Sequence, residues 1–555
     1  MAPSIPISAE LLVRNGLFPE NLPSVFTTRA IWSHLPAATT SYAVTSKAVG
    51  ELCTYDASKR GGQRRIFAIP HPLFIRDQGI FFERHWAALE ACFEAAKGST
   101  SRPIIDGAGL RYVRITRHSD LPRIRLTRLS RFAHCLVADV SRCYYSIHSH
   151  SIPWALHGKA ASKSDSNPQS ATIFGNRLDY TVRQAQSRQT MGIPVGPDSS
   201  MIIAELVMSA VDKRMIELSG SKPPTYVRHV DDYWIGGHTH DECERYLTNL
   251  RLALNDFSLD VNELKTRIIS TKFVFGETWP SQIERAIAEN ITLYHDNDSE
   301  AVATLGMIVE RAVESNDDGI IKNATRVIDR RRLWRSNWEL LEHFLAQCAV
   351  QFPHSFDYVA RVVAWRIRSG TKVDKDLWVD IARTTATCDG SLGRDSEVCW
   401  AIWLLKELKS RLPKSLTDVV AENASPLVLA FLVHFTKHGM AGDRKLIEKL
   451  RGRVAGDPFA GPFWPLTLEL KHFNDEDPNW AAANTVTVLR GLHENRVSII
   501  DWNAPPRVFE ADSEQPASRL PNYAIEDVGS DYLGNHDEDD EDEDDGFYDP
   551  DDVGS

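Results

Sequence analysis

The stretch from Thr225 to Gly237 constrains the fold of this chain more than any other segment. It reads Thr-Tyr-Val-Arg-His-Val-Asp-Asp-Tyr-Trp-Ile-Gly-Gly, so apolar and aromatic residues flank two adjacent acids. The pattern predicts a β-hairpin with Asp231 and Asp232 at or beside its turn. Neighbouring carboxylates repel each other, and cations held between them would relieve the repulsion. The alternative is ordinary turn chemistry, because Asp side chains often bond to the backbone of turns.

A further acid is predicted at the end of a buried strand. The apolar run that begins at Cys135 ends in Asp139, and such a run is typical of a strand that delivers a side chain to a site at its end. A carboxylate there is costly to bury unless it is paired or binds a metal. An aromatic pair follows, beginning at Tyr144, and core packing would explain that pair equally well.

A loop rich in Gly and Pro separates these two acidic segments. Residues 191–200 read Met-Gly-Ile-Pro-Val-Gly-Pro-Asp-Ser-Ser, and glycines in such a loop let the backbone approach a ligand closely. An ordinary connector is the alternative interpretation. The loop leads into a predicted helix from Met201 to Met215, with Ser199 or Ser200 as its N-cap.

Two basic segments precede the first acid. Residues 58–65 form a Gly-containing basic turn that enters a short apolar strand, and they suit either phosphate binding or a solvated hairpin. The segment from Arg111 to Arg131 alternates basic and apolar residues around Arg123 and Arg125, which predicts a strand.

The rest of the chain is predicted to be largely helical. Apolar residues at helical spacing predict helices over 80–97 and 243–257, and residues 158–176 are predicted to be a polar loop. From about 295 to 505 the same spacing recurs between Pro or Gly turns, which predicts helices of roughly 12–18 residues without a fixed repeat period.

Charge is distributed unevenly along the sequence. Of the 75 acidic residues, 15 lie between Glu526 and Asp552, so the other 60 nearly balance the 63 basic residues. The body is therefore compatible with a nucleic-acid partner without being evidence for one. The sequence shows no signal peptide and no apolar run of about 18 residues, and its eight cysteines lack zinc-ligand spacing, which predicts a cytoplasmic protein without a membrane span.

The motifs, taken in order, resemble those of the reverse transcriptase family over roughly residues 50–280. Asp139 with Tyr144 resembles the first palm motif of that family, residues 192–200 the second, residues 229–232 the third, and residues 259–266 the fourth. The amino-acid sequence of the Gly/Pro loop and the long helical C-terminus resemble those of one branch of the family in particular. This branch comprises the bacterial abortive-infection and unknown-group reverse transcriptases that act in phage defence.

The resemblance implies an α+β right-hand polymerase core of fingers and palm, followed by an all-α, repeat-like C-terminal domain. The domains expected from it are an N-terminal extension (1–50), the fingers and palm (51–290), the α-helical domain (291–505) and a disordered acidic tail (506–555). It also implies a homo-oligomer, either a trimer or a hexamer, with dNTPs as substrates and DNA as product.

The resemblance also implies roles for individual residues. Two Mg²⁺ ions, for which Mn²⁺ can substitute, would be held by Asp139, the Val140 carbonyl, Asp231 and Asp232. Further expected roles are protonation of pyrophosphate by Lys265, triphosphate binding by Arg64 and Arg65, sugar selection by Tyr144, base contact by Val195 and Gly196, and protein priming by Tyr42. For Tyr42 the alternative is a packing residue.

Two departures from the family pattern bear on function. His229 stands where the family usually has Tyr, and Val195 stands where templated members typically have Gln. The second departure favours template-independent DNA synthesis in antiphage defence. The alternatives are an RNA-templated enzyme that uses a partner non-coding RNA, and a non-catalytic nucleic-acid-binding scaffold.

Overall fold

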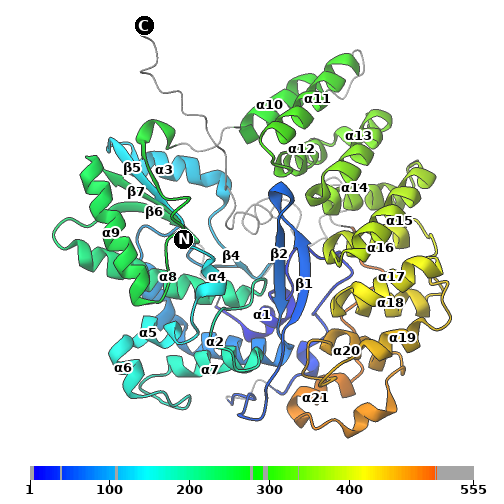
Figure 1. Ribbon diagram of the computed structural model, residues 1–555, viewed down its shortest axis with the longest axis horizontal. Coiled ribbons are helices and arrows are strands. Elements are labelled where there is room, and N and C mark those ends of the chain that lie inside the picture. Colours follow the sequence, from blue (N-terminus) through cyan, green and yellow to red (C-terminus); the bar gives the residue numbers. More distant parts are fainter. Residues whose placement is uncertain are drawn as a thin grey trace.

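The computed structural model describes residues 6–37, 41–106, 111–274, 279–291, 298–335, 337–506 and 508. They form a mixed α/β protein with many helices (Figure 1). The predicted acidic tail lies outside the described residues apart from 506 and 508. Within the part described, no helix combines the length and apolar character needed to cross a membrane. The eight cysteines are free thiols, and six of them are buried.

A four-stranded antiparallel sheet carries the acidic segments. Its strand order is β6-β7-β5-β8, formed by β5 (His134–Ala138), β6 (Thr225–His229), β7 (Asp232–Gly237) and β8 (Arg267–Ser270). Strand β5 pairs with β7 on one side and with β8 on the other. Its apolar composition fits this central position, because a strand paired on both edges is largely shielded from water.

The predicted β6–β7 hairpin is confirmed, and its Gly pair has a packing role. His229 pairs with Asp232, which leaves only Val230 and Asp231 in the turn. A Cβ atom on Gly236 would lie 2.3 Å from the Phe132 ring, and one on Gly237 would lie 2.5 Å from the Cys243 Sγ. Glycine is therefore required here because neighbouring side chains press directly against the strand.

The helices of the N-terminal half are α1 (Ala9–Asn15), α2 (Pro72–Ala95), α3 (Leu121–Leu129), α4 (Cys143–Ser146), α5 (Ser151–His157), α6 (Lys159–Ser164), α7 (Gly175–Ala185), α8 (Asp198–Ser219) and α9 (His240–Asp256). Helices α3 and α9 pack against the four-stranded sheet, and the other helices of this half pack mainly against one another. Helices α2 and α9 confirm the predictions at 80–97 and 243–257, although both begin earlier than expected. Helix α6 lies inside the stretch that was predicted to be a polar loop.

Two local predictions were wrong. Residues 121–129 form helix α3 instead of a strand, and its buried residues Leu121, Arg125 and Leu129 recur every four positions, which is the helical period. Helix α8 begins at Asp198, and Pro197 at its N-cap makes no side-chain cap bond, so neither Ser199 nor Ser200 caps it. The alternation that predicted a strand and the serines that predicted an N-cap each involve only a few residues. Such short patterns determine the structure less strongly than tertiary packing does.

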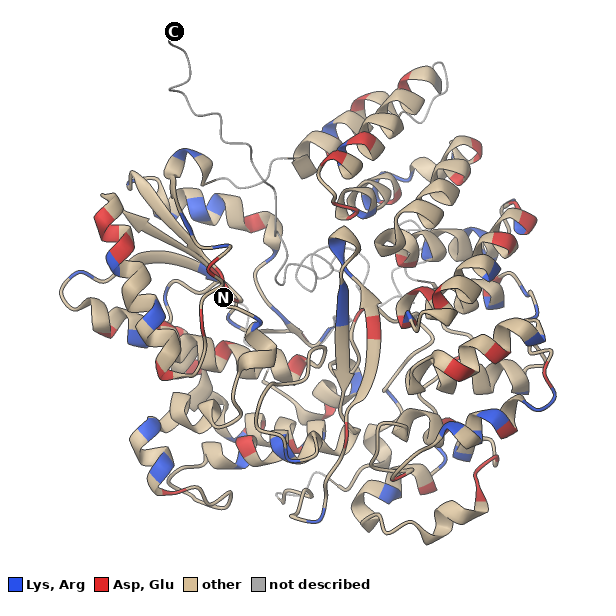
Figure 2. Ribbon diagram, viewed as in Figure 1, with Lys and Arg blue, Asp and Glu red and all other residues tan. Residues whose placement is uncertain are grey.

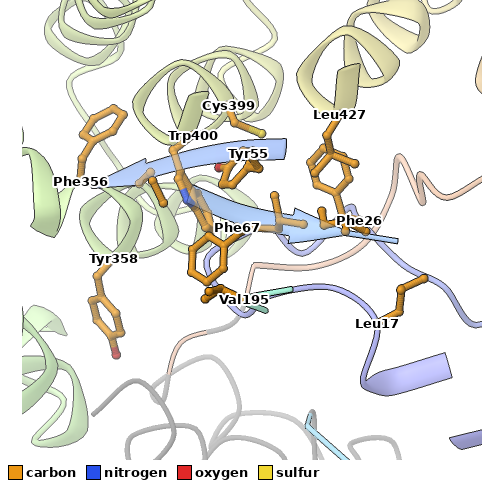
Figure 3. Close-up of a cluster of buried hydrophobic side chains, with 14 of the residues drawn as sticks. Leu17, Phe26, Tyr55, Phe67, Val195, Phe356, Tyr358, Cys399, Trp400 and Leu427 are labelled. Atoms are coloured by element: carbon orange, nitrogen blue, oxygen red, sulfur yellow. The ribbon is translucent and has the colours of Figure 1, made fainter. Parts of the chain in front are cut away.

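A second hairpin lies between the sheet and the C-terminal helices (Figure 1). It is formed by β1 (Cys53–Ser58) and β2 (Arg64–Ile69), paired from Cys53 with Ile69 to Ser58 with Arg64. Figure 3 shows Tyr55 of β1 beside Cys399, and Phe67 of β2 beside Val195. The hairpin is therefore packed on both sides. The remaining strands, β3 (Ile104–Ile105) and β4 (Val113–Arg114), form a short separate pair.

The C-terminal half of the chain is helical, as predicted. Its helices are α10 (Trp279–Asn290), α11 (Asp298–Glu314), α12 (Gly319–Arg330), α13 (Trp338–Gln351), α14 (Phe356–Arg368), α15 (Lys375–Ser391), α16 (Asp395–Glu407), α17 (Lys414–Asn423), α18 (Pro426–Lys437), α19 (Leu446–Arg453), α20 (Trp464–His472) and α21 (Thr487–Glu494). They follow one another along an arc beside the β1–β2 hairpin (Figure 1). Several are shorter than the predicted 12–18 residues, the shortest having 8.

The N-terminal segment joins the two halves of the molecule. The Thr27 amide donates to the Ile499 carbonyl at 2.8 Å, and the Asp501 amide donates to the Val25 carbonyl at 2.7 Å. The Trp400 indole of α16 donates to the Asn21 carbonyl at 2.9 Å. One hydrophobic core extends through both halves, so the segment before residue 50 is part of the packed structure.

Polar contacts attach the tip of the β1–β2 hairpin to the helices. The Arg60 Nε donates to Asp317 at 2.8 Å, and the Arg64 guanidinium donates to Glu397 of α16, with one bond of 3.1 Å. The Gly61 amide donates to Asp318 at 3.0 Å. Figure 2 shows basic residues on β2 and acidic residues on the C-terminal helices. These contacts hold the hairpin against the helices from its tip to its middle.

We expect Glu397→Gln to lower the free energy of unfolding by about 1–3 kcal/mol. Glu397 is almost fully buried and Arg64 is partly exposed, so loss of the charge leaves a half-buried guanidinium with Asp56 alone. Urea unfolding measures the change. Lys414→Gln is the control, because it removes the exposed pair with Asp418 and is expected to change stability by less than about 0.5 kcal/mol. Equal effects from the two variants would contradict the prediction.

Candidate active site

Three carboxylates meet at one end of the sheet. Asp139 directly follows β5, Asp231 lies in the β6–β7 turn and Asp232 begins β7. Ala138 pairs with Tyr233, so a continued register sets Asp139 opposite Asp232. Asp139 is 4% exposed and Asp231 is 1% exposed. The structure therefore brings the acids predicted from the sequence to the same sheet end.

The segment after α9 delivers a cation to this end of the sheet. Val140 forms an isolated bridge with Val261, and the Asn262 amide donates to the Asp139 carbonyl at 2.8 Å. This pairing brings the Lys265 Nζ to 3.9 Å from the Asp139 Oδ2. The structure therefore brings Lys265 to the sheet end that carries the acids.

Arg228 holds the turn that carries Asp231, and sequence reasoning missed this role. Its guanidinium is fully buried and donates to both carboxylate oxygens of Glu205, at 2.8 and 3.0 Å, and to Asp212 at 2.9 Å. It also donates to the Val230 carbonyl at 2.9 Å, and the Tyr233 hydroxyl donates to Asp212 at 2.6 Å. The only signal in the sequence was a charged residue within an apolar strand.

This network shapes the turn as well as the core. Val230 has a φ of 53°, a conformation that costs a β-branched residue energy and persists only where surrounding contacts enforce it. The bond from Arg228 to its carbonyl supplies such a contact. Burial raises the pKa of Asp212, whereas Arg228 lowers it. Arg228 is thus a positioning residue for Asp231.

His229 is a buried neutral imidazole. The Thr100 hydroxyl donates to the Arg228 carbonyl at 2.9 Å, so its oxygen accepts from the His229 Nδ1 at 3.0 Å. Burial, aided by Arg125 and Arg228, lowers the pKa of His229 to about 3. The imidazole therefore stays uncharged at physiological pH.

The Gly/Pro loop lies against the segment that follows Asp139. The Ile193 amide donates to the Tyr144 carbonyl at 2.8 Å, and the Gly192 amide donates to the Ile147 carbonyl at 3.0 Å. Gly192 has a φ of 81°, which favours glycine. The structure thus brings together the loop and the aromatic position that the sequence singled out.

Val195 and Gly196 connect this loop to the β1–β2 hairpin. The Ala68 amide donates to the Val195 carbonyl at 2.9 Å, and the Val195 side chain is 8% exposed beside Phe67 (Figure 3). The Arg111 guanidinium donates to the Gly196 carbonyl at 3.1 Å. The Val195 side chain therefore belongs to the hydrophobic core.

The structure uses Arg64 differently from the prediction. Its guanidinium donates to Asp56 at 3.1 Å and to Glu397, and these two carboxylates raise the pKa of Arg64 against the opposing effect of burial. The expected triphosphate contact of Arg64 is therefore replaced by an attachment to α16. Arg65 is buried on the same strand.

Tyr42 lies in a packed position. Its ring is half-buried between the guanidinium groups of Arg84 and Arg177, whose Cζ atoms lie 4.4 and 4.2 Å from the ring centroid. Burial raises the pKa of its phenol. The next two amides, of Ala43 and Val44, donate to the Asp77 carboxylate. These contacts agree with the packing interpretation of Tyr42.

The donor set at the sheet end suits a hard divalent cation. Carboxylate and carbonyl oxygens are the ligands that Mg²⁺ prefers, and two of the three acids are buried beside one another in the fold. Among the residues that the structure describes, no group of three or more His, Cys, Asp or Glu side chains is arranged so that it could hold an ion. The type of donor atom at the sheet end therefore suits Mg²⁺, whereas the arrangement of the side chains in this structure does not form a complete ion site.

We expect Arg228→Met to destabilise the protein by about 3–5 kcal/mol, because it leaves Glu205 and Asp212 buried without their cation. Urea unfolding measures the loss. Arg214→Met is the control, since Arg214 is exposed and pairs with Asp256 at the surface. The prediction is wrong if the two variants unfold at the same urea concentration.

Comparisons with known proteins bear on this site. Residues 107–309 match the family model of the reverse transcriptase, an RNA-dependent DNA polymerase, and this span includes all three acids and Lys265. No curated protein matches the chain significantly.

Three solved telomerase structures are similar to the chain, all at low TM-scores. The first is apo telomerase from Candida tropicalis, with 10% identity, a TM-score of 0.32 and a match that covers 79% of this chain and 76% of that one. The second is the same telomerase truncated from its C-terminal domain, with 13% identity, a TM-score of 0.27 and coverage of 41% of this chain and 51% of that one. The third is telomerase from Candida albicans in complex with a fragment of telomeric RNA, with 11% identity, a TM-score of 0.25 and coverage of 71% of this chain and 65% of that one. The chain spans about half of the truncated telomerase. These structures share too little backbone geometry with this chain to bear on its activity.

The family match and the acids at the sheet end agree. Residues 107–309 of this chain therefore match a reverse transcriptase domain, and that match includes the three acids and Lys265.

Proposed function

We propose that this protein polymerises dNTPs into DNA at the sheet end that carries Asp139, Asp231 and Asp232. The observation that supports this most is the burial of Asp139 and Asp231 at adjoining strand ends, with the Lys265 Nζ 3.9 Å from Asp139. Buried acids of this kind are costly unless they serve a cation. On this proposal the four-stranded sheet is the palm, the β1–β2 hairpin belongs to the fingers within 51–290, and 291–505 is the helical domain.

The proposed chemistry assigns a task to each group. Two divalent ions, when bound, would activate the primer hydroxyl and neutralise the leaving pyrophosphate. Asp139 and Asp231 would hold them, with Asp232 and the Val140 carbonyl as further oxygen donors. Lys265 would protonate or steady the pyrophosphate. Arg65 would bind the triphosphate, as predicted, whereas Arg64 would not, because it is paired with Asp56 and Glu397.

Tyr144 and Gly196 keep the substrate roles predicted for them. Tyr144 would exclude a ribose hydroxyl, and it lies against the loop whose Gly196 holds a bond from Arg111. The bond from Arg111 to the Gly196 carbonyl and the bond from the Ala68 amide to the Val195 carbonyl hold the loop between the β1–β2 hairpin and α8. The proposed nucleotide site would therefore lie between β2 and the sheet.

Template-independent synthesis is part of the proposal, and the surroundings of Val195 support it. Val offers no hydrogen-bonding group, and the polar residues nearby are used elsewhere. Asp198 accepts from the Tyr112 amide at 3.1 Å and pairs with Arg111, and Arg188 donates to the Ser46 carbonyl at 2.9 Å. Asp198 is fully buried, and Arg188 is directed by its bond towards Ser46, so both have other partners than a template–dNTP pair.

The biological setting follows from the resemblance alone. Residues 192–200 and the long helical C-terminus resemble the abortive-infection and unknown-group reverse transcriptases, so we place the activity in antiphage defence, in a homo-oligomeric enzyme. Protein priming belongs to the same setting. The half-buried ring and raised pKa of Tyr42 disfavour its attack on a nucleotide, and the proposal does not depend on Tyr42.

Asp139→Asn, and separately the double variant Asp231→Asn with Asp232→Asn, should reduce nucleotide incorporation at least about 1000-fold, because the ligand oxygens lose their charge at constant volume. Labelled dNTPs with Mg²⁺ provide the assay, and circular dichroism checks the fold. Asp260→Asn is the matched control, since its exposed side chain is adjacent in sequence to the Val140–Val261 bridge. Polymerisation by the double variant would reject the site and leave a nucleic-acid-binding scaffold as the better interpretation.

We expect the product to have biased or random sequence, because the core-packed Val195 offers no hydrogen-bonding group that could distinguish base-pairing edges. Nuclease-treated protein is supplied with dNTPs and one defined template strand, and the product is sequenced. Long, faithful complements of that strand would contradict template independence. Loss of activity after ribonuclease treatment would instead indicate a partner RNA template.

A further inference from the structure

A cavity of about 90 Å³ lies between the N-terminal segment and the helical half, and none of the residues assigned above to catalysis lines it. Four arginines, Arg14, Arg29, Arg111 and Arg361, contribute to its lining, with Glu20 as the one acid. The walls therefore carry an excess of positive charge. In a partly enclosed space such an excess attracts anions more strongly than it would in open water.

Among the four arginines, Arg361 gives the strongest indication that the cavity binds an anion. It belongs to α14, is 7% exposed, and its guanidinium lies 5.0 Å from the Trp400 ring and 5.9 Å from the Tyr358 ring. Within the described residues its five N–H groups make no hydrogen bond or ion pair. The nearby Asp357 carboxylate is bonded by Lys322 at 2.9 Å. Aromatic stacking fixes the guanidinium while leaving its donors for a ligand.

Ser24 adds a second buried donor at the same cavity. Its hydroxyl is buried and has no hydrogen-bond partner among the described residues, and the residue lines the cavity beside the strand-like segment at Val25. Buried donors of this kind are uncommon, because each forfeits its bond to water. Arg361 and Ser24 line the cavity from opposite halves of the chain, so both halves contribute a donor to it.

The other arginines differ in how they are held. Arg111 is buried, pairs with Asp198 and has its Nε 3.4 Å from the Glu20 Oε1. Arg14 pairs with Glu10 at 2.8 Å, whereas the Arg29 side chain is exposed to solvent. Arg111 and Arg14 therefore carry partly compensated charge. Arg361 interacts with Asp357, which is also paired with Lys322, so Arg361 and Arg29 supply most of the net attraction.

We propose that this cavity binds a phosphate-bearing anion, either free pyrophosphate or the terminal phosphate of a nucleic-acid strand. A water needs about 10–15 Å³ of such space, so 90 Å³ accommodates roughly six waters, or one to two phosphate groups. A whole nucleotide is excluded, since pockets for ligands of that size have about 300 Å³ or more. A guanidinium with free parallel N–H groups suits phosphate oxygens in particular.

Isothermal titration calorimetry of the full-length protein in EDTA tests this site. The probes are pyrophosphate and ten-residue oligothymidylates with a 5′-phosphate or a 5′-hydroxyl. We expect Arg361→Gln, Ser24→Ala and the exposed Arg29→Gln each to weaken binding of the phosphate probe, with Arg361→Gln costing at least about tenfold. Arg368→Gln is the matched control on the same helix, because Arg368 pairs with Glu407 outside the cavity.

The variant Asp139→Asn with Asp231→Asn separates this site from the proposed polymerase site and should bind the probes unchanged. Tighter binding of the 5′-phosphorylated strand than of the 5′-hydroxyl strand supports the strand end as the ligand, and binding of pyrophosphate alone supports the free anion. The proposal is overturned if no phosphate probe binds the unmodified protein at millimolar concentration. It is also overturned if binding is lost in the double Asp variant and kept in Arg361→Gln and Arg29→Gln.

Discussion

The geometry of the proposed active site depends on one buried cation. Arg228 sets a single guanidinium against the carboxylates of Glu205 and Asp212, and it also holds the Val230 carbonyl. Desolvating these charges is costly, and only the complete set of bonds compensates for the cost. The same bonds maintain the positive φ of Val230. Through this turn the orientation of Asp231 depends on a residue that contacts no substrate.

The helical half takes part in shaping the site. It fixes the β1–β2 hairpin through Arg60 and Arg64, and the hairpin in turn bonds the Val195 carbonyl through the Ala68 amide. A change in the position of α16 would therefore be transmitted to the loop beside the proposed nucleotide site. The N-terminal segment, which pairs with residues near 500, closes the structure from the other side.

The sequence pattern was enough to predict the secondary structure wherever a few neighbouring residues determine the local backbone conformation. The hairpin around Asp231, the strand that ends at Asp139 and the helices of the C-terminal half were all predicted, because period, turn residues and apolar runs act over a few residues. The prediction of a strand over 121–129 was wrong, because the alternation of basic and apolar residues was brief. The buried residues of α3 recur with the helical period. Propensity is a weak signal where packing partners lie far away in sequence.

The sequence by itself determined which acids, glycines and loop make up the proposed site, since each is embedded in a motif whose spacing is local. Only the tertiary structure decided what the arginines do. Arg228 became the centre of a buried network, Arg64 an attachment to Glu397 and Arg361 a stacked donor beside a cavity. A guanidinium acquires its role from the acceptors around it. Glu397, the acceptor of Arg64, is 333 residues away, and the N-terminal residues that line the cavity at Arg361 are also distant in sequence. No local pattern reveals such partners.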